Sequence, residues 1–257
     1  MATVPHLLLQ EMTREEARAV APQTLVVFPV GAVEQHGPHL PVGTDYFTVE
    51  HVSRAAAAQV AEQIPVVVAP TLPFGSSHHH LPFGGTMSLS TETYYKVVYE
   101  LAETLITSGF RRIFIVNGHG GNHELVQLVA RDLTLKYEAH LAAGSYWNIA
   151  WDEVAEAGRE MPGGLPGHAG IYETSQILAL RPELVHEPRP HRDLAAPAVH
   201  SPVSPYRSQI HGSWQRINGF TDSPDRADAT QGQRYLDAVV GGVARALVEF
   251  YRATEAA

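Results

Sequence analysis

The sequence contains no cysteine among its 257 residues. Disulfide bonds, thiolate catalysis and zinc sites built on cysteine are therefore excluded. No uninterrupted apolar run approaches the ~20 residues that a transmembrane helix needs. The N-terminus also lacks the basic and long apolar regions of a signal peptide. These absences favour a soluble protein of the cytoplasm.

Positive charge is scarce as well. The formal net charge is -9, with 18 lysines and arginines against 27 aspartates and glutamates, and the basic residues form no run. A nucleic-acid-binding protein more often shows a basic patch, so we expect neither nucleic acid nor a membrane as a partner. Hydrophobic residues make up 44% of the chain, which is enough to bury a sizeable core. We expect a single domain over residues 1–257.

Short apolar runs alternate with segments of helical character. The apolar runs are rich in β-branched residues and predict strands at 24–30, 66–69, 112–116 and 141–146. The segments between and after them predict helices at 44–63, about 90–108, 122–138, 171–180 and 229–254. This alternation predicts an α/β fold with a mainly parallel sheet, in which ligands bind beyond the carboxyl ends of the strands.

The segment 183–223 differs from the rest of the chain. It is rich in proline, histidine, serine and arginine, and it shows little periodicity. A loop of this length in a compact domain usually carries function or is disordered. We interpret it as an irregular arm or lid, or as a contact to another subunit.

A loop rich in glycine and proline follows the first predicted strand and carries Glu34, His36 and Asp45. Carboxylate oxygens and imidazole nitrogens on a stiff loop are what a divalent metal ion requires. Asp45 lies near a helix start and could instead serve that helix N-terminus. A Glu-x-His pair followed nine residues later by aspartate is more specific than either part alone, so we interpret all three as metal ligands.

A second cluster, Asn-Gly-His-Gly-Gly-Asn at residues 117–122, follows the third predicted strand. Glycines before a helix can cradle a phosphate, but this spacing matches neither the dinucleotide fingerprint nor the P-loop. We therefore interpret His119 as a metal ligand whose glycine neighbours let the backbone approach the ion closely.

A third cluster places His168 on a loop and Glu173 in the first turn of the helix predicted at 171–180. Both side chains can point toward the rim where the strands end. The alternatives are a surface histidine and an ordinary carboxylate facing the helix dipole. We favour a catalytic role for His168 and a catalytic or metal-binding role for Glu173.

Contacts to a substrate are predicted from aromatic and histidine residues. Three successive histidines, 78–80, cannot all face one site, and His80 is our choice because it is nearest the Phe-Gly-Gly-Thr turn; a solvated loop is the alternative. Tyr146, Trp147 and Trp151 follow the fourth predicted strand, and the two tryptophans are spaced to share a helix face. They are candidates for substrate binding, with core packing as the alternative.

At these positions the chain resembles the creatininase family of metal-dependent amidohydrolases. The resemblance runs from about residue 24 to 180 and is carried by the motifs at 30–41, 44–45, 83–86, 117–122 and 168–175. It implies a three-layer α/β/α sandwich with a mostly parallel sheet, two divalent metal ions per subunit (Zn, Mn or Fe), and usually a homohexamer. Family members use a metal-activated water to cleave C–N bonds of small or cyclic amides. Their activities include opening creatinine, deformylating a formylamino-pyrimidine nucleotide and trimming the mycofactocin peptide.

Carried over by motif, Glu34, Asp45 and His119 hold one metal ion, His36 and a bridging Asp45 hold the other, and His168 transfers protons. Creatininase itself completes the second site with a glutamate two residues after the motif histidine. Here that position is Gly121, so Glu173 is the expected replacement ligand. The departure argues against creatinine as substrate, whereas the aromatic residues near Trp147 favour a small, flat, cyclic amide.

Other functions compete with a creatininase-like one. A formamide deformylase or a peptide-trimming enzyme belongs to the same family, and a non-catalytic metal-binding assembly protein would keep the site without turnover. A metal-dependent phosphoesterase is a further alternative. It would need a cationic clamp for phosphate, for which Arg207, Arg216 and Arg226 are candidates.

Overall fold

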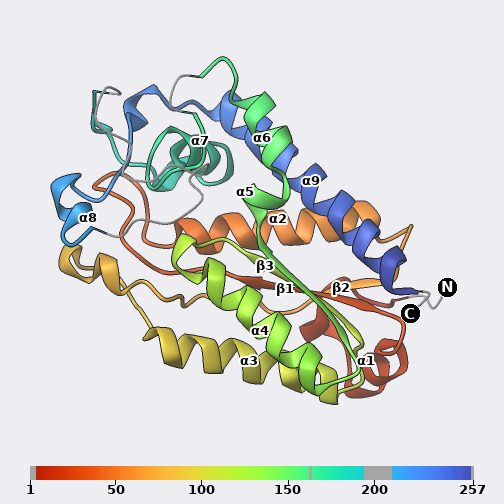
Figure 1. Ribbon diagram of the computed structural model, residues 1–257. Coiled ribbons are helices and arrows are strands. Elements are labelled where there is room, and N and C mark those ends of the chain that lie inside the picture. The colour runs from red at the N-terminus through yellow and green to blue at the C-terminus, as the bar shows by residue number, and fades with distance from the viewer. Residues whose placement is uncertain (1–3, 162–163, 194–209, 256–257) are drawn as a thin grey trace.

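A parallel sheet forms the centre of the protein. The computed structural model describes residues 4–161, 164–193 and 210–255 (Figure 1). The strands are β1 (Leu25–Val30), β2 (Val66–Val68), β3 (Arg112–Asn117) and β4 (His140–Ser145). They lie in the order β2-β1-β3-β4, and every pairing is parallel. The mainly parallel sheet predicted from the sequence is confirmed.

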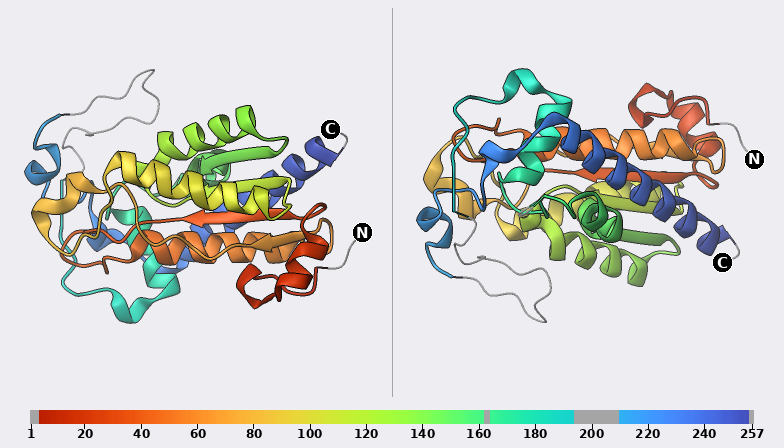
Figure 2. Two further views of the ribbon diagram at one scale, coloured as in Figure 1. Left: turned by 90° about the horizontal axis from the view of Figure 1, so that it is seen from below. Right: turned by 90° about the horizontal axis from the view of Figure 1, so that it is seen from above.

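Helices cover both faces of this sheet, which gives the three predicted layers (Figures 1 and 2). The helices of the described residues are α1 (Arg14–Val20), α2 (Thr44–Val60), α3 (Thr91–Thr107), α4 (His123–Lys136), α5 (Tyr146–Ile149), α6 (Trp151–Ala157), α7 (Ile171–Leu180), α8 (Ser213–Arg216) and α9 (Ala229–Glu255). One face carries α2 and α9, and the other carries α3 and α4.

Strand β1 separates two hydrophobic cores. Leu25 and Val27 pack toward α2 and α9, whereas Val26, Phe28 and Val30 pack toward α3 and α4. Successive side chains of a strand point to opposite faces, so a central strand with helices on both sides must be apolar throughout. This explains the continuous apolar run that predicted the strand.

The structure contains short helices that the sequence did not predict. Helix α1 begins at a capping box in which Thr13 and Glu16 bond each other's backbone. Helices α5 and α6 follow β4 directly and pack on α9, so tertiary contacts rather than propensity define them. Within 183–223, the structure describes α8 and the end of a short 3-10 helix, while residues 194–209 lie outside the described part.

Helix α9 is amphipathic and packs along α2, α6 and α7. Among the helices that the structure describes, neither this one nor any other combines the length and apolarity needed to cross a membrane. It lies close to α7 at Gly232, where a Cβ would be 1.8 Å from the carbonyl oxygen of Ser175. The backbones of the two helices therefore meet without an intervening side chain.

We expect Gly232→Ala to lower the free energy of unfolding by about 1–3 kcal/mol, because the added methyl must push α9 away from α7. The matched control is Gly241→Ala in the same helix, where a Cβ has no neighbour within 4 Å. That variant should gain up to about 1 kcal/mol, since alanine favours a helix more than glycine does. Urea denaturation measures the free energy of unfolding of both variants. Equal changes in the two variants would contradict the close packing of α9 on α7 at Gly232.

Candidate metal centre

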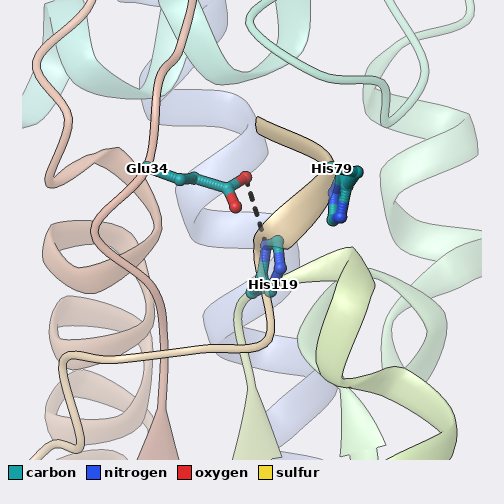
Figure 3. Close-up of side chains that lie close together, drawn as sticks. All are labelled: Glu34, His79 and His119. Atoms are coloured by element: carbon teal, nitrogen blue, oxygen red, sulfur yellow. Dashed lines mark ion pairs between the residues drawn. The ribbon is translucent and has the colours of Figure 1, made fainter. Parts of the chain in front are cut away.

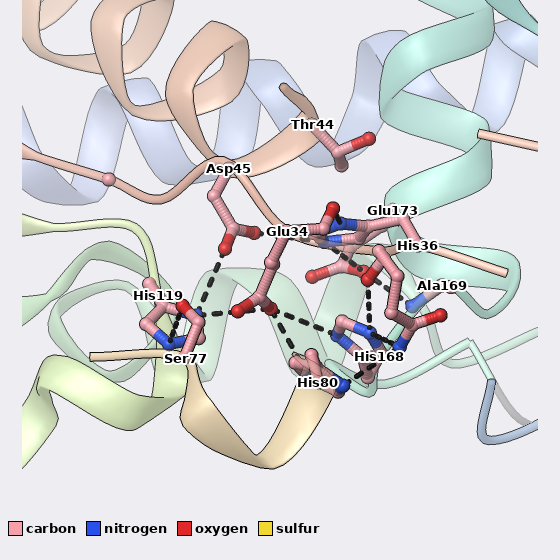
Figure 4. A network of polar contacts seen from close by, with 12 residues as sticks. Glu34, His36, Thr44, Asp45, Ser77, His80, His119, His168, Ala169 and Glu173 are labelled. Atoms are coloured by element: carbon pink, nitrogen blue, oxygen red, sulfur yellow. Dashed lines mark hydrogen bonds and ion pairs between the residues drawn. The ribbon is translucent and has the colours of Figure 1, made fainter. Parts of the chain in front are cut away.

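Titratable side chains from separate segments converge beyond the carboxyl ends of the strands (Figure 4). Glu34 and His36 come from the loop after β1, and Asp45 from the first turn of α2. His119 follows β3, and Glu173 lies in the first turn of α7. All five are at most 9% exposed. Segments far apart in the chain therefore meet at one edge of the sheet.

Asp45 lies between two imidazoles. Its Oδ1 is 3.1 Å from Nε2 of His36, and its Oδ2 is 3.0 Å from Nδ1 of His119. Nδ1 of His119 is also 3.2 Å from Oε1 of Glu34, and Nε2 of His36 is 3.6 Å from Oε2 of Glu173. One carboxylate therefore connects two donor groups, which is the arrangement of a bridging ligand.

The loops are built to bring these residues together. The N-cap position of α2 is Gly43, and no side chain caps that helix end, so Asp45 is not used as a cap. At Gly118 a Cβ would lie 2.6 Å from Cβ of Val49 in α2. Only glycine therefore lets the loop after β3 pass close enough to α2 for His119 to reach Asp45.

Backbone carbonyls fix the orientation of both imidazoles. Nδ1 of His36 donates to the carbonyl oxygen of Glu34 at 3.1 Å, and Nε2 of His119 lies 3.2 Å from that of Ser76. The opposite nitrogen of each ring then faces Asp45. A histidine ligand of a metal is usually held by such a second hydrogen bond. The side chains of Asn117 and Asn122 bind neighbouring backbone groups.

The burial of Glu34 is electrostatically unfavourable. The residue is fully buried, and neither of its carboxylate oxygens accepts a hydrogen bond from the described residues. A buried carboxylate without partners is strongly unfavourable unless positive charge lies beside it. The oxygen and nitrogen donors around it suit a divalent cation.

Three groups of side chains could each hold a metal ion, because their donor atoms lie within 4.8 Å of one another. They are Glu34 with His79 and His119 (Figure 3), Glu34 with His36 and His168, and His36 with Asp45 and Glu173. These residues fit a metal ion by geometry and by charge.

Proton affinities in the cluster follow from these contacts. Burial alone would lower the pKa of His36, but the carboxylates of Asp45 and Glu173 raise it to about 10. Burial raises the pKa of Glu173 to about 8, against the opposing effect of His36. Despite burial, Glu34 and Asp45 raise the pKa of His119 well above its ordinary value. Without a metal ion the cluster therefore holds protons at neutral pH.

His80 and His168 lie on the other side of Glu34 and behave differently. Nε2 of His80 and Nδ1 of His168 are 3.4 and 3.7 Å from Oε1 of Glu34. Burial lowers the pKa of His80 to about 3 and lowers the pKa of His168 well below its ordinary value. Both rings are therefore neutral at pH 7, and their centroids stack 4.3 Å apart.

An aromatic residue that the sequence analysis missed packs against this pair. The ring of Trp214 in α8 lies edge-on to His80 and His168, with centroids 4.8 and 5.1 Å away. It comes from the irregular segment 183–223, in which no periodicity marks any residue. The sequence therefore offered no local signal for its position.

Of the aromatics predicted as substrate contacts, two pack in or against the hydrophobic core. Tyr146 is 2% exposed and belongs to the hydrophobic core, with its hydroxyl 3.5 Å from Oε1 of Gln176. Trp147 packs against Tyr146 and the core under α9, and Trp151 begins α6. The structure thus places Tyr146 in the core rather than at the surface of the site, because α5 turns toward α9 directly after β4.

Gly121 has no room for a side chain. A Cβ there would lie 2.3 Å from the carbonyl oxygen of Ser76 and 2.5 Å from Nε2 of His119. A glutamate at this position would require the loop to move. Glu173 approaches the cluster from α7 instead, with Oε2 held at 2.6 Å by the backbone N–H of Ala169.

We expect Zn²⁺ binding to release at least one proton per subunit near pH 7, because His36 and Glu173 hold protons that the metal must displace. The affinity for the metal ion should therefore rise as the pH increases through the raised pKa values of His36 and Glu173. Calorimetric titration in two buffers of different ionisation enthalpy counts the protons. A heat independent of the buffer would contradict this account.

Comparisons with known proteins identify the family of this chain. A family model described as Creatininase, creatinine amidohydrolase, matches residues 10–247. Mycofactocin precursor peptide peptidase of Mycobacterium tuberculosis is 33% identical over 226 residues, which cover 86% of this chain and 83% of that protein. Creatinine amidohydrolase of Pseudomonas putida is 31% identical over 259 residues, covering 93% and 94%. A solved creatininase variant of the Zn-Zn type matches with TM-score 0.77 and 28% identity over 95% of this chain and 97% of that one. The chain belongs to the creatininase family.

Proposed function

We propose that this protein is a metal-dependent amidohydrolase that cleaves a C–N bond of a small amide with two divalent ions per subunit. The observation that carries the proposal is the position of Asp45, one oxygen of which faces His36 and the other His119. Glu34 and Glu173 add a second carboxylate on each side. Zinc in a solved family member supports the class of ion.

In this proposal Glu34, Asp45 and His119 hold one ion, and His36, Asp45 and Glu173 hold the other. When bound, the ions would polarise the amide carbonyl and make water acidic enough to act as a nucleophile near neutral pH. The task left to the chain is proton transfer and orientation of the substrate.

His168 is the proposed proton carrier. Its Nδ1 faces Glu34 at 3.7 Å, and its ring is neutral, so that it can accept a proton from the attacking water. The same proton must pass to the leaving nitrogen, because an amide anion is a very poor leaving group. Trp214 and His80 border His168 and form a wall against which a substrate can lie.

The proposal favours a formamide or a peptide-like amide over creatinine. Gly121 stands where creatininase has a glutamate, and the close contacts around it leave no space for one. Similarity to both a peptide peptidase and a creatinine amidohydrolase leaves both substrates to be tested. Assembly as a homohexamer and a location in the cytoplasm are further proposals, which rest on the family and on the composition.

A phosphoesterase has less support. Arg216 is exposed and donates to the carbonyl oxygen of His211, and Arg226 is exposed in a short 3-10 helix. Arg207 lies outside the described residues. The groups that converge on the site are carboxylates and imidazoles, which do not supply the cationic clamp that a phosphate would need.

The proposal is tested by metal content and by hydrolysis, in wild type and in Asp45→Ala. We expect about two ions per wild-type subunit, most of them lost in the variant, with activity lowered at least ~100-fold. The substrates are creatinine, a formylamino-pyrimidine, a short peptide and p-nitrophenyl phosphate. Asp237→Ala, an exposed carboxylate of α9, is the matched control and should keep its metal and activity.

Two outcomes would contradict the proposal. A wild type that takes up no Zn²⁺ or Mn²⁺ would remove the metal centre. A wild type that holds metal yet hydrolyses none of the amides would favour a metal-binding assembly protein, and turnover of the phosphate ester alone would favour a phosphoesterase.

A further inference from the structure

Gln35 lies between His80 and His168 and contacts both rings. Its Nε2 is 2.9 Å from Nδ1 of His80, 2.9 Å from Nε2 of His168 and 3.0 Å from the carbonyl oxygen of Gly219. The residue is 6% exposed, so these contacts lie in the protein interior. An amide nitrogen carries only two hydrogens, and these three neighbours therefore cannot all accept from it.

Two backbone groups fix which way the amide points. Oε1 of Gln35 accepts from the backbone N–H of Gly37 at 2.9 Å, while Nε2 donates to the carbonyl oxygen of Gly219. A backbone N–H only donates and a carbonyl oxygen only accepts, so the opposite orientation of the amide is excluded. One amide hydrogen remains for the two imidazoles.

The main chain of Gln35 decides which imidazole receives that hydrogen. Its carbonyl oxygen lies 3.0 Å from Nε2 of His168 and can only accept, so this contact is a hydrogen bond only if Nε2 of His168 carries the hydrogen. The remaining amide hydrogen then goes to Nδ1 of His80, and the hydrogen of His80 must sit on its Nε2. This assignment gives each of these atoms a complementary partner.

With this assignment both rings carry their hydrogen on Nε2. The two rings present different nitrogens to Glu34, beside which both lie in Figure 4. His80 points its Nε2, which carries a hydrogen, toward Oε1 of Glu34 at 3.4 Å. His168 directs the nitrogen that carries a lone pair, at 3.7 Å. A donor and an acceptor therefore stand side by side on one wall of the site.

We propose that Gln35 fixes the tautomers and orientations of His80 and His168. His80 then donates a hydrogen bond through Nε2 to the carbonyl oxygen of the bound amide, while Nδ1 of His168 stays unprotonated. The inference rests on the proposed function and adds to it a catalytic residue, His80, and a positioning residue, Gln35. The carbonyl oxygen gains negative charge in the transition state, and a fixed donor strengthens as that charge grows. No covalent bond to His80 forms or breaks.

Gly219 couples this pair to the segment that carries Trp214. Gly219 has a φ of +72°, and a Cβ there would lie 2.4 Å from Oε1 of Gln35. Gly219→Ala therefore displaces the amide without changing any polar group. Gly212→Ala is a matched control, because Gly212 has a φ of +69° and a Cβ there would meet only Oε1 of Gln215, at 4.0 Å.

Kinetics on the amide that wild type hydrolyses fastest test the role of His80. His80→Leu should lower kcat about 10²–10³-fold, with little change in KM and with metal content kept. His80→Gln should recover much of the loss, since its amide nitrogen can donate from near the same place. His78→Gln changes an exposed neighbour and should leave kcat unchanged. Equal activities of His80→Leu and His80→Gln would overturn the role of His80.

Variants of Gln35 test the positioning role. Gln35→Glu replaces the donor by an acceptor, so His80 must turn its hydrogen away from the site, and kcat should fall about as far as in His80→Leu. Gly219→Ala should lower kcat more than Gly212→Ala does. A Gln35→Glu enzyme with wild-type kcat would overturn the positioning role.

Neutron diffraction from deuterated protein reads the hydrogens directly and does not depend on activity. We expect deuterium on Nε2 of both His80 and His168, and none on Nδ1 of either ring. Deuterium on Nδ1 of His80 would overturn the inference. A metal-loaded wild type that hydrolyses no amide would contradict the proposed function and the role of His80, while the neutron map still decides the hydrogen arrangement.

Discussion

The burial of Glu34 is the constraint on which the rest of the site depends. A carboxylate removed from water and left without hydrogen bonds is stable only beside positive charge. Imidazoles of His119, His80 and His168 lie 3.2–3.7 Å from its Oε1, and they come from segments far apart in the chain. The fold therefore has to bring these segments together. The positive charge beside Glu34 is the proton of His119 or a metal ion, because burial keeps the rings of His80 and His168 neutral.

The parallel sheet meets this requirement because the carboxyl ends of its strands lie along one edge. The loop after β1 supplies Glu34, and the loop after β3 supplies His119 where a glycine, Gly118, allows it to pass against α2. Gln35 and Gly219 then link the loop after β1 to the segment before α9. Ligand geometry, proton positions and the surrounding wall are thus set by the same few backbone contacts.

Much of this was predictable from the sequence, because the decisive signals are local. The apolar run of β1 and the glycine-rich motifs around Glu34 and His119 indicated a parallel sheet with polar groups at its edge. Trp214 was missed because its position depends on a long-range contact of Gly219 with Gln35, which leaves no local pattern. The short helices α5 and α6 were missed for a similar reason, since packing on α9 defines them.

Anomalous X-ray diffraction from crystals soaked in Mn²⁺ or Zn²⁺ would locate the ions at Asp45. We expect two anomalous peaks per subunit that share Asp45, one beside Glu34 and His119 and the other beside His36 and Glu173. A single peak away from Asp45, or no peak among these five side chains, would contradict it.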